Sequence, residues 1–317
     1  MLTSMAVTGS LSHHCRSNSI PHLSFFFHLL KSPQPSFSQS PTLHQARRTL
    51  ILESASESVS LHRLSDSDAG IVEVRLGRIE VKNAIGMDMV RGLRSSFEAI
   101  TRDLSAKVVL VCSSVPKVFC AGADLKERKK MTPSEVLHFA NSLRSTCSFL
   151  EVLSIPTIAA IEGAALGGGL EIAISCDLRT CGEDAVLGMP ETGLAIIPGA
   201  GGTQRLPRLV GKSIAKDLIF TGRRVTGRDA FSMGLVNYCV PAGEAYMKAL
   251  EIARVIKQKG PIAIRMAKRA INGGIETDLV SALELEGECY EQLLDTKDRL
   301  EGLAAFAEKR KPIYMGE

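Results

Sequence analysis

The sequence predicts an α/β fold that ends in a helical region. From Ile71 onward, short β-branched segments typical of strands alternate with longer segments of helical periodicity. Strands separated by helices require crossover connections, which implies at least one sheet covered on its faces. After Gly201 the pattern becomes mainly helical. With 317 residues, 45% of them hydrophobic, the chain is long enough to bury a large core.

Up to residue 161, predicted strands and helices follow one another in turn. A glycine loop, FCAGADLKER, lies between two of them at 119–128 and leads into a short polar helix. The predicted elements are, in order, an alternating strand over 71–76, a helix over 83–100 with one apolar face, a buried strand over 107–113, an amphipathic helix from Pro133 to Leu153 and a strand from Ile158 to Ile161.

The stretch that follows, 161–206, is the most informative part of the chain. Three glycines, 167–169, open a predicted amphipathic helix that carries Glu171. Without Cβ atoms, a ligand can approach peptide N–H groups at the positive end of the helix dipole, a place that suits an oxyanion or a phosphate. A second carboxylate, Glu191, lies in a turn marked by Pro190 and Gly193. The pattern is therefore two carboxylates beside an anion-binding loop.

Beyond Gly201 we expect successive amphipathic helices and one short strand. Gly260-Pro261 and Gly273-Gly274 are helix start and stop signals. The apolar faces left over suit packing against a neighbouring subunit. The predicted helical segments are 202–210, 212–220, 226–234, 245–258, 261–273 and 278–294, with a strand over 235–240.

Residues 1–52 differ from the rest of the chain in composition. They contain ten Ser, five of the seven His and four basic residues, but no acidic residue before Glu53. This composition is typical of an organelle transit peptide, and a disordered tail is the alternative. We expect the transit peptide to be cleaved near Arg47-Arg48. The apolar run Leu23 to Leu30 is too short to span a bilayer, and we expect no membrane span.

Charge and cysteine usage exclude several classes of function. Beyond residue 52 the chain carries 34 basic and 34 acidic residues, a neutral balance that argues against nucleic acid as a partner. The basic run Arg128-Lys129-Lys130 is interpreted as a solvated helix face. The eight cysteines form no CxxC pair, so we expect buried thiols and no metal site. GAGGT at 199–203 lacks the strand and acidic residue of a dinucleotide fingerprint, so we expect no NAD.

Three separated segments together resemble the enoyl-CoA hydratase/isomerase (crotonase) family. They are FCAGADLKE, GAALGGGLEIAISCD and GMPETGLAIIPGAGGTQRLPR, and the similarity extends from about Ser60 to the C-terminus. Within the family, FCAGADLKER, LAIIPG, TQRLPR and TKDRLEGL are most similar to methylglutaconyl-CoA hydratases. The resemblance implies a spiral of ββα units over 53–257 and a helical region over 258–317 that assembles trimers or hexamers. It also implies that the protein is located in the mitochondrion, and the peroxisome and the plastid are the alternative locations.

The resemblance also implies a site for a 2-enoyl-CoA thioester. The N–H groups of Ala123 and Gly168 would bind the thioester oxygen, and Glu171 and Glu191 would be the catalytic pair. Coenzyme A enters as part of the substrate, and no separate cofactor is expected. The implied CoA-binding residues are Lys82, Ala121, Ala123, Asp124, Leu125, Lys126, Phe306 and Lys309, and the acyl pocket would involve Met131, Phe139 and Leu143.

Each of these residues also has an ordinary structural explanation. Standing alone, Glu171 is better explained as a first-turn glutamate, Glu191 as a turn residue and Asp124 as a helix N-cap. The joint match of three segments favours the hydratase interpretation. Its rivals are an enoyl-CoA isomerase, an acyl-CoA hydrolase and an RNA-binding protein, for which the helical stretch Leu137 to Leu150 offers a single cation, Arg144.

Overall fold

A computed structural model describes residues 51–54 and 56–317. The predicted targeting segment, 1–52, lies outside these residues except for its last two, which begin strand β1 (Ile51–Ser54). Among the described residues, no helix combines the length and the apolar character needed to cross a bilayer.

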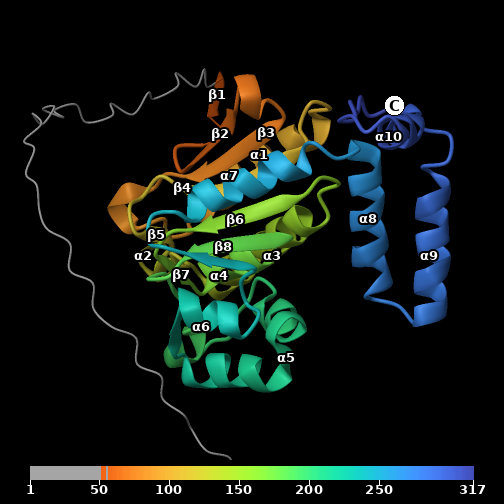
Figure 1. The fold of residues 1–317 in the computed structure, drawn as a ribbon. Helices are drawn as coiled ribbons and strands as arrows, with labels where there is room; N and C mark the ends of the chain where they lie inside the picture. Colours follow the sequence, from red (N-terminus) through yellow and green to blue (C-terminus); the bar gives the residue numbers. More distant parts are fainter. Residues whose placement is uncertain (1–50, 55) are drawn as a thin grey trace, which may run out of the picture. The chain divides into compact units, whose positions relative to one another are not determined.

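The larger of two sheets has seven strands, in the order β1-β2-β3-β4-β6-β8-β11 (Figure 1). Strands β1 to β3 form an antiparallel meander, whereas β3, β4, β6, β8 and β11 are parallel. Crossover connections therefore place helices on the sheet, as the alternating pattern predicts. The strand bounds are β2 Val59–Arg63, β3 Ile71–Leu76, β4 Val108–Ser113, β6 Thr157–Ile161, β8 Leu178–Gly182 and β11 Tyr238–Val240.

The smaller sheet has four short strands, in the order β10-β9-β7-β5. Each of three successive units gives one strand to each sheet (β4 and β5, β6 and β7, β8 and β9) before a helix follows. This repetition is the spiral of ββα units that the resemblance implies, and the fold prediction is confirmed. Sequence periodicity missed the smaller sheet because its strands have only three residues each: β5 Val118–Cys120, β7 Ala164–Leu166, β9 Val186–Gly188 and β10 Arg224–Thr226.

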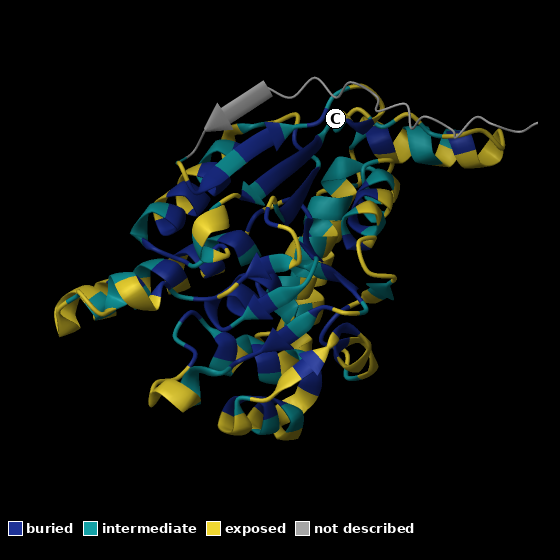
Figure 2. Cartoon of the chain, turned by 90° about the vertical axis from the view of Figure 1, so that its left-hand side faces the viewer, coloured by how far each residue is buried: buried dark blue, intermediate teal, exposed yellow. Residues whose placement is uncertain are grey.

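Both faces of the larger sheet are buried. Helix α7 packs on one face of β4, β6 and β8, and helix α1 packs on the other face against β2 and β3. The alternation in β3 therefore does not mark a solvent face. Glu73 is fully buried beneath α7, where it accepts hydrogen bonds from Arg75 Nε at 2.8 Å and from the Tyr246 hydroxyl. Figure 2 shows that buried residues fill the strands and the helix faces against them.

Ten α-helices and three 3-10 turns accompany the sheets within the described residues. The segments predicted over 202–210 and 212–220 are joined in α5, where Gly211 has a non-helical φ of 79°. The helices are α1 Met87–Arg102, α2 Leu125–Arg128, α3 Pro133–Glu151, α4 Gly168–Ile174, α5 Gly202–Thr221, α6 Gly227–Ser232, α7 Ala245–Ile256, α8 Pro261–Gly274, α9 Leu279–Glu291 and α10 Lys297–Ala307. The 3-10 turns are η1 Asp66–Asp68, η2 Ile79–Val81 and η3 Glu191–Leu194.

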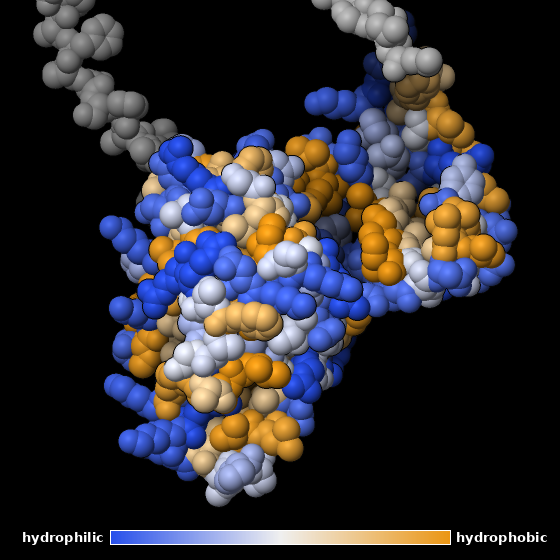
Figure 3. Space-filling view, turned by 90° about the horizontal axis from the view of Figure 1, so that it is seen from below, coloured by the Kyte–Doolittle hydropathy of each residue, from blue (hydrophilic) through white to orange (hydrophobic). Residues whose placement is uncertain are grey.

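The C-terminal helices α8 to α10 leave large apolar side chains exposed. Helices α8 and α9 pack mainly against each other (Figure 1), and Lys268 anchors α8 to the core through Asp177 at 2.7 Å. Apolar side chains gather on the surface of this lobe, on the right of Figure 3. The exposed apolar residues are Ile271, Leu279, Val280, Leu283, Leu300, Leu303 and Phe306.

Candidate active site

Two glycine loops from successive ββα units face each other. At Gly122, φ is +94° and a Cβ would lie 2.8 Å from the carbonyl oxygen of Leu166, so the backbones approach closely only because the residue is glycine. A Cβ on Gly168 would lie 3.9 Å from the Ala123 nitrogen. Within the described chain, the N–H groups of Ala123 and Gly168 have no protein acceptor. Two unpaired donors therefore lie beside each other.

Glu171 lies in helix α4, and its carboxylate is held by backbone donors. The Oε1 atom accepts hydrogen bonds from the N–H groups of Ala200 and Gly202, both at 2.7 Å. Burial raises the pKa of this carboxyl, and the two N–H groups oppose that effect. Helix α4 was predicted to be amphipathic, but all seven of its residues are buried, because both sheets and α5 surround it. Glu171 is therefore a core residue and not an exposed first-turn glutamate.

Glu191 begins the 3-10 turn η3 on another wall of the same cavity. A Cβ at Gly167, where φ is +50°, would lie 2.9 Å from Glu191 Oε1, so the glycine makes room for this carboxylate. Its Oε2 atom is buried and has no hydrogen-bond partner among the described residues. Burial, together with the negative charge of Glu171, raises the pKa of Glu191 to about 7. This carboxyl can therefore carry a proton at neutral pH.

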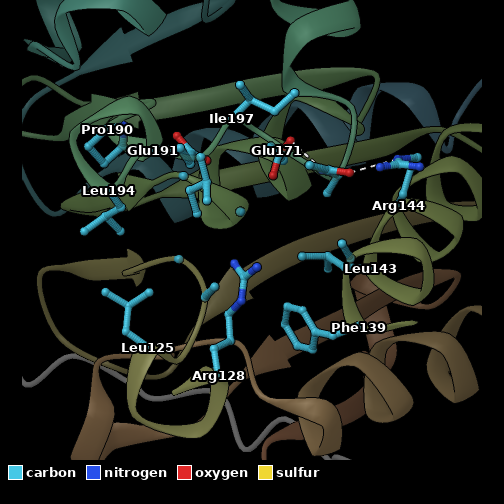
Figure 4. A pocket seen from close by; sticks show the side chains of 18 of the residues that line it. Leu125, Arg128, Phe139, Leu143, Arg144, Glu171, Pro190, Glu191, Leu194 and Ile197 are labelled. Atoms are coloured by element: carbon cyan, nitrogen blue, oxygen red, sulfur yellow. Dashed lines mark hydrogen bonds between the residues drawn. The ribbon is translucent and has the colours of Figure 1, made fainter. Parts of the chain in front are cut away.

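The glycine loops and both glutamates line one cavity of about 540 Å³ (Figure 4). Its other walls are mostly apolar. Phe139 and Leu143 line it from α3, as expected for an acyl pocket, whereas Met131 packs against the core instead. An apolar cavity with a few convergent polar groups of raised pKa is the usual form of a small-molecule site. Two N–H donors and two carboxyls here can bind a developing oxyanion and transfer protons.

The predicted CoA-binding residues fall into three groups. Ala121, Ala123 and Leu125 line the cavity. Lys82, Asp124 and Lys126 do not, although Lys82 lies next to the glycine loop, since its carbonyl accepts the Ala121 N–H at 3.1 Å. Phe306 and Lys309 belong to the C-terminal lobe and do not line the cavity within one chain.

Asp124 has the ordinary role that its position predicts. Its Oδ1 accepts the N–H groups of Lys126 and Glu127, both at 3.0 Å, as the N-cap of α2, and its Oδ2 pairs with Arg78 at 2.9 Å. These contacts fix the direction in which α2 leaves the glycine loop. Asp124 therefore orients the cavity wall without lining the cavity.

Sequence reasoning missed two parts of the site. The interpretation of Arg128 as part of a solvated face is wrong, because Arg128 is half-buried and lines the cavity. The run GAGGT at 199–203 belongs to one of the segments that carry the family resemblance, but no role in the site is predicted for it from the sequence. It supplies the two N–H groups that hold Glu171. Gly202 is required there, because a Cβ would lie 3.0 Å from Glu171 Oε1. The clustered glycines of 199–203 were the feature of the sequence that could have indicated this close backbone approach.

Comparisons with known proteins identify the family of the chain. Residues 66–317 match the family described as enoyl-CoA hydratase/isomerase. "Probable enoyl-CoA hydratase 2, mitochondrial" of Arabidopsis thaliana is 62% identical over 283 residues, which cover 89% of this chain and 94% of that protein. The mitochondrial methylglutaconyl-CoA hydratase of Mus musculus is 47% identical over 82% of this chain and 84% of that protein. A crystal structure of enoyl-CoA hydratase from Bacillus anthracis has a TM-score of 0.79 and 46% identity, and the match covers 82% of this chain and 100% of that one.

Proposed function

The chain belongs to the enoyl-CoA hydratase/isomerase family, a family of enzymes, and we propose that it adds water across the 2,3 double bond of a 2-enoyl-CoA thioester. The product would be a 3-hydroxyacyl-CoA. The observation that carries this proposal is the placement of two carboxyls of raised pKa, Glu171 and Glu191, in the cavity that also contains two unpaired N–H donors.

The two N–H donors would bind the thioester oxygen. When water attacks C3, the electrons of the double bond move toward C2 and the carbonyl, which gives the oxygen enolate charge. Donors from Ala123 and Gly168 stabilise that charge without any metal ion. Loss of one such donor typically costs about 3 kcal/mol of barrier.

The surroundings of the two glutamates support different roles in proton transfer, with Glu171 as the base and Glu191 as the acid. Glu171 Oε1 is occupied by the Ala200 and Gly202 N–H groups, so Oε2 is available to orient the water and take its proton. Glu191, with a pKa near neutrality, delivers a proton to C2. One proton leaves the water and one reaches C2, so Glu171 ends protonated and Glu191 ionised. Proton exchange with solvent restores the starting state.

The coenzyme A part of the substrate would lie along the glycine loop and α2. Ala121 and Leu125, which line the cavity, would contact it from the same chain, and Lys82 and Lys126, which are adjacent to this loop, would do so from outside the cavity. Phe306 and Lys309 would reach it from a neighbouring subunit. The exposed apolar residues of α8 to α10 support self-association of the chain into trimers or hexamers.

The names of similar proteins support a mitochondrial location. Both the Arabidopsis thaliana and the Mus musculus proteins carry that word in their names. A role in the breakdown of fatty acids or branched-chain amino acids follows from the proposed reaction and from the methylglutaconyl substrate named for the second protein.

The test is hydration by the purified full-length chain of crotonyl-CoA and 3-methylglutaconyl-CoA, supplied separately. We expect loss of the ultraviolet absorbance of the conjugated thioester and formation of 3-hydroxyacyl-CoA, checked by product chromatography. Movement of the double bond without hydration would instead show an isomerase, which typically needs one carboxylate. Release of free CoA thiol would show a hydrolase. The ratio of the two kcat/KM values would assign the acyl preference.

A further inference from the structure

The loop 199–202 contacts Glu171 on one side and two arginines on the other. Two of its N–H groups donate to the carboxylate. On its other side, Arg144 Nε donates a hydrogen bond to the Gly199 carbonyl at 2.8 Å, and Arg205 Nη1 donates one to the next carbonyl at 2.9 Å. In Figure 4, Glu171 and Arg144 lie on opposite sides of this loop, and each is joined to it by a dashed line. Two guanidinium groups therefore hold the loop that holds the carboxylate.

The contact from Arg144 acts on the same peptide group that binds Glu171. The Gly199 carbonyl and the Ala200 N–H belong to one peptide unit, and that N–H donates to Glu171 Oε1 at 2.7 Å. A cation at the oxygen of a peptide polarises its N–H, so the successive hydrogen bonds strengthen one another. The order guanidinium, peptide, carboxylate therefore favours the ionised form of Glu171.

Arg205 is a fixed support for the neighbouring peptide group. Only 12% of its side chain is exposed, and its Nε and Nη2 atoms donate to Glu151 Oε2 on α3, at 3.1 and 2.7 Å. A Cβ on Gly201, where φ is +112°, would collide with Arg205 Nη1, so the guanidinium reaches the loop only because this residue is glycine. Arg205 does not line the cavity. It can therefore influence the reaction only through its surroundings.

The charges around Glu171 agree with this geometry. Burial raises the pKa of Glu171, whereas the two N–H groups and then the charges of Arg205 and Arg144 lower it. Glu191 is the acidic group on the other wall of the cavity. The thiols near α4 are neutral at pH 7, because burial raises their pKa to about 12, and the remaining cation on β8 donates to a carbonyl at the end of α4. These further titratable groups are Cys120, Cys147, Cys181 and Arg179.

Given the proposed hydration reaction, in which Glu171 takes a proton from water, we propose that Arg205 and Arg144 are positioning residues of this base. They hold the loop 199–202 so that its N–H groups keep Glu171 ionised and in place. Both arginines act from α3, since Arg144 belongs to that helix and Arg205 is paired with its Glu151. The helix that forms the apolar wall of the cavity thus also fixes the base.

The test is the pH dependence of crotonyl-CoA hydration by full-length variants. Arg205→Gln removes the charge, and Arg205→Lys restores it without the planar fork. Arg144→Gln acts on the same loop from an exposed position. One control, Glu151→Gln, breaks the ion pair of Arg205 but leaves its guanidinium at the loop. The other, Arg208→Gln, removes an exposed charge of α5 that is paired with Glu276.

We expect Arg205→Gln to lower kcat by about 10- to 100-fold and to change KM by less than about threefold, because a displaced base affects the chemical step. The base must be ionised, so kcat/KM rises as pH rises through the pKa of Glu171. Loss of a nearby cation raises that pKa, and the acid limb of the profile should therefore move to higher pH. Arg144→Gln should move it less, since an exposed charge is screened by solvent. Arg205→Lys should return the limb toward that of the wild type.

The controls separate positioning from simple anchoring of α5 to α3. Glu151→Gln removes a negative charge, so its acid limb should not move to higher pH, and Arg208→Gln should behave as wild type. An equal shift in Glu151→Gln and Arg205→Gln would assign the effect to the ion pair and overturn the proposal. An unmoved limb in both Arg205→Gln and Arg144→Gln would also overturn it. Equal melting temperatures would show that the variants are folded, and Arg144→Gln keeps the test decisive if Arg205→Gln is not.

A measurement without turnover distinguishes this proposal from the proposed reaction. In protein labelled with ¹³C at the glutamate carboxyl groups, the Glu171 signal is identified by its absence in Glu171→Gln. Its titration midpoint should move to higher pH in Arg205→Gln and stay in place in Arg208→Gln. This shift is expected even if the wild type hydrates no thioester, whereas an unmoved midpoint in an enzyme that hydrates crotonyl-CoA would overturn the role of Arg205 alone.

Discussion

The surroundings of Glu171 and Glu191 differ although both residues line one cavity. Glu171 lies inside a fully buried helix and receives two N–H donors at 2.7 Å from the loop that starts α5. Glu191 lies on a single 3-10 turn, with one oxygen close to Gly167 and the other without a hydrogen-bond partner. Two backbone N–H groups thus hold one carboxylate at a single oxygen, whereas the other carboxylate has one buried oxygen without a hydrogen-bond partner among the described residues.

This difference separates the roles of two chemically identical side chains. Donors to an oxygen favour its ionised form, whereas burial without donors favours the protonated form. Environment alone can therefore create a base and an acid from two glutamates, a general route to acid and base chemistry at neutral pH. The same arrangement also predicts that the two positions respond differently to substitution.

The largest expected effect is on turnover. Glu171→Gln and Glu191→Gln should each lower kcat for crotonyl-CoA by at least about a hundredfold, because each amide can neither accept nor deliver the proton. Steady-state hydration measures this effect, and Glu183→Gln, which removes an exposed carboxylate paired with Arg228, serves as the matched control. Near-normal activity in either cavity variant would show that the pair has been assigned wrongly.

The sequence predicted most of the fold and the two glutamates. The long helices and the buried strands β4 and β6 carry strong periodicity and were found near their observed bounds. The three-residue strands of the smaller sheet were missed, because such segments hold too few residues to show a period. The surroundings of α4 were also misjudged, since burial on all sides depends on both sheets, which local sequence does not reveal.

Within the site, the sequence predicted residues but not their contacts. The hydrogen bonds to Glu171 come from Ala200 and Gly202, about thirty positions away, and no local pattern reports that proximity. The basic run Arg128-Lys129-Lys130 predicts a solvated face, yet α2 ends after one turn, and of these three residues only Arg128 lines the cavity. Both features depend on how loops from different ββα units meet.

The next effect is on stability, and it tests the contrast in hydrogen bonding. Glu171→Ala leaves two buried N–H groups unpaired, at a typical cost of about 1–3 kcal/mol for each. Glu191→Ala removes a carboxylate whose Oε2 has no hydrogen-bond partner, so it should lower the free energy of unfolding far less than Glu171→Ala does. Denaturant unfolding of the two variants measures the difference, with Glu171→Gln, which keeps an acceptor for both N–H groups, as the control. Equal destabilisation by the two alanine substitutions would contradict the inferred difference in hydrogen bonding between Glu171 and Glu191.

The smallest effect is on pH dependence, and it tests how the two carboxyls interact. Hydration requires protonated Glu191, so kcat/KM for crotonyl-CoA should fall as pH rises through the pKa of about 7. The negative charge of Glu171 contributes to raising that pKa, whereas Glu171→Gln removes the charge and should move the alkaline limb of the residual activity to lower pH. The shift should be smaller than the total elevation, because burial is its main cause. Glu183→Gln should leave the limb in place, and an unmoved limb in Glu171→Gln would show that the two carboxyls titrate independently.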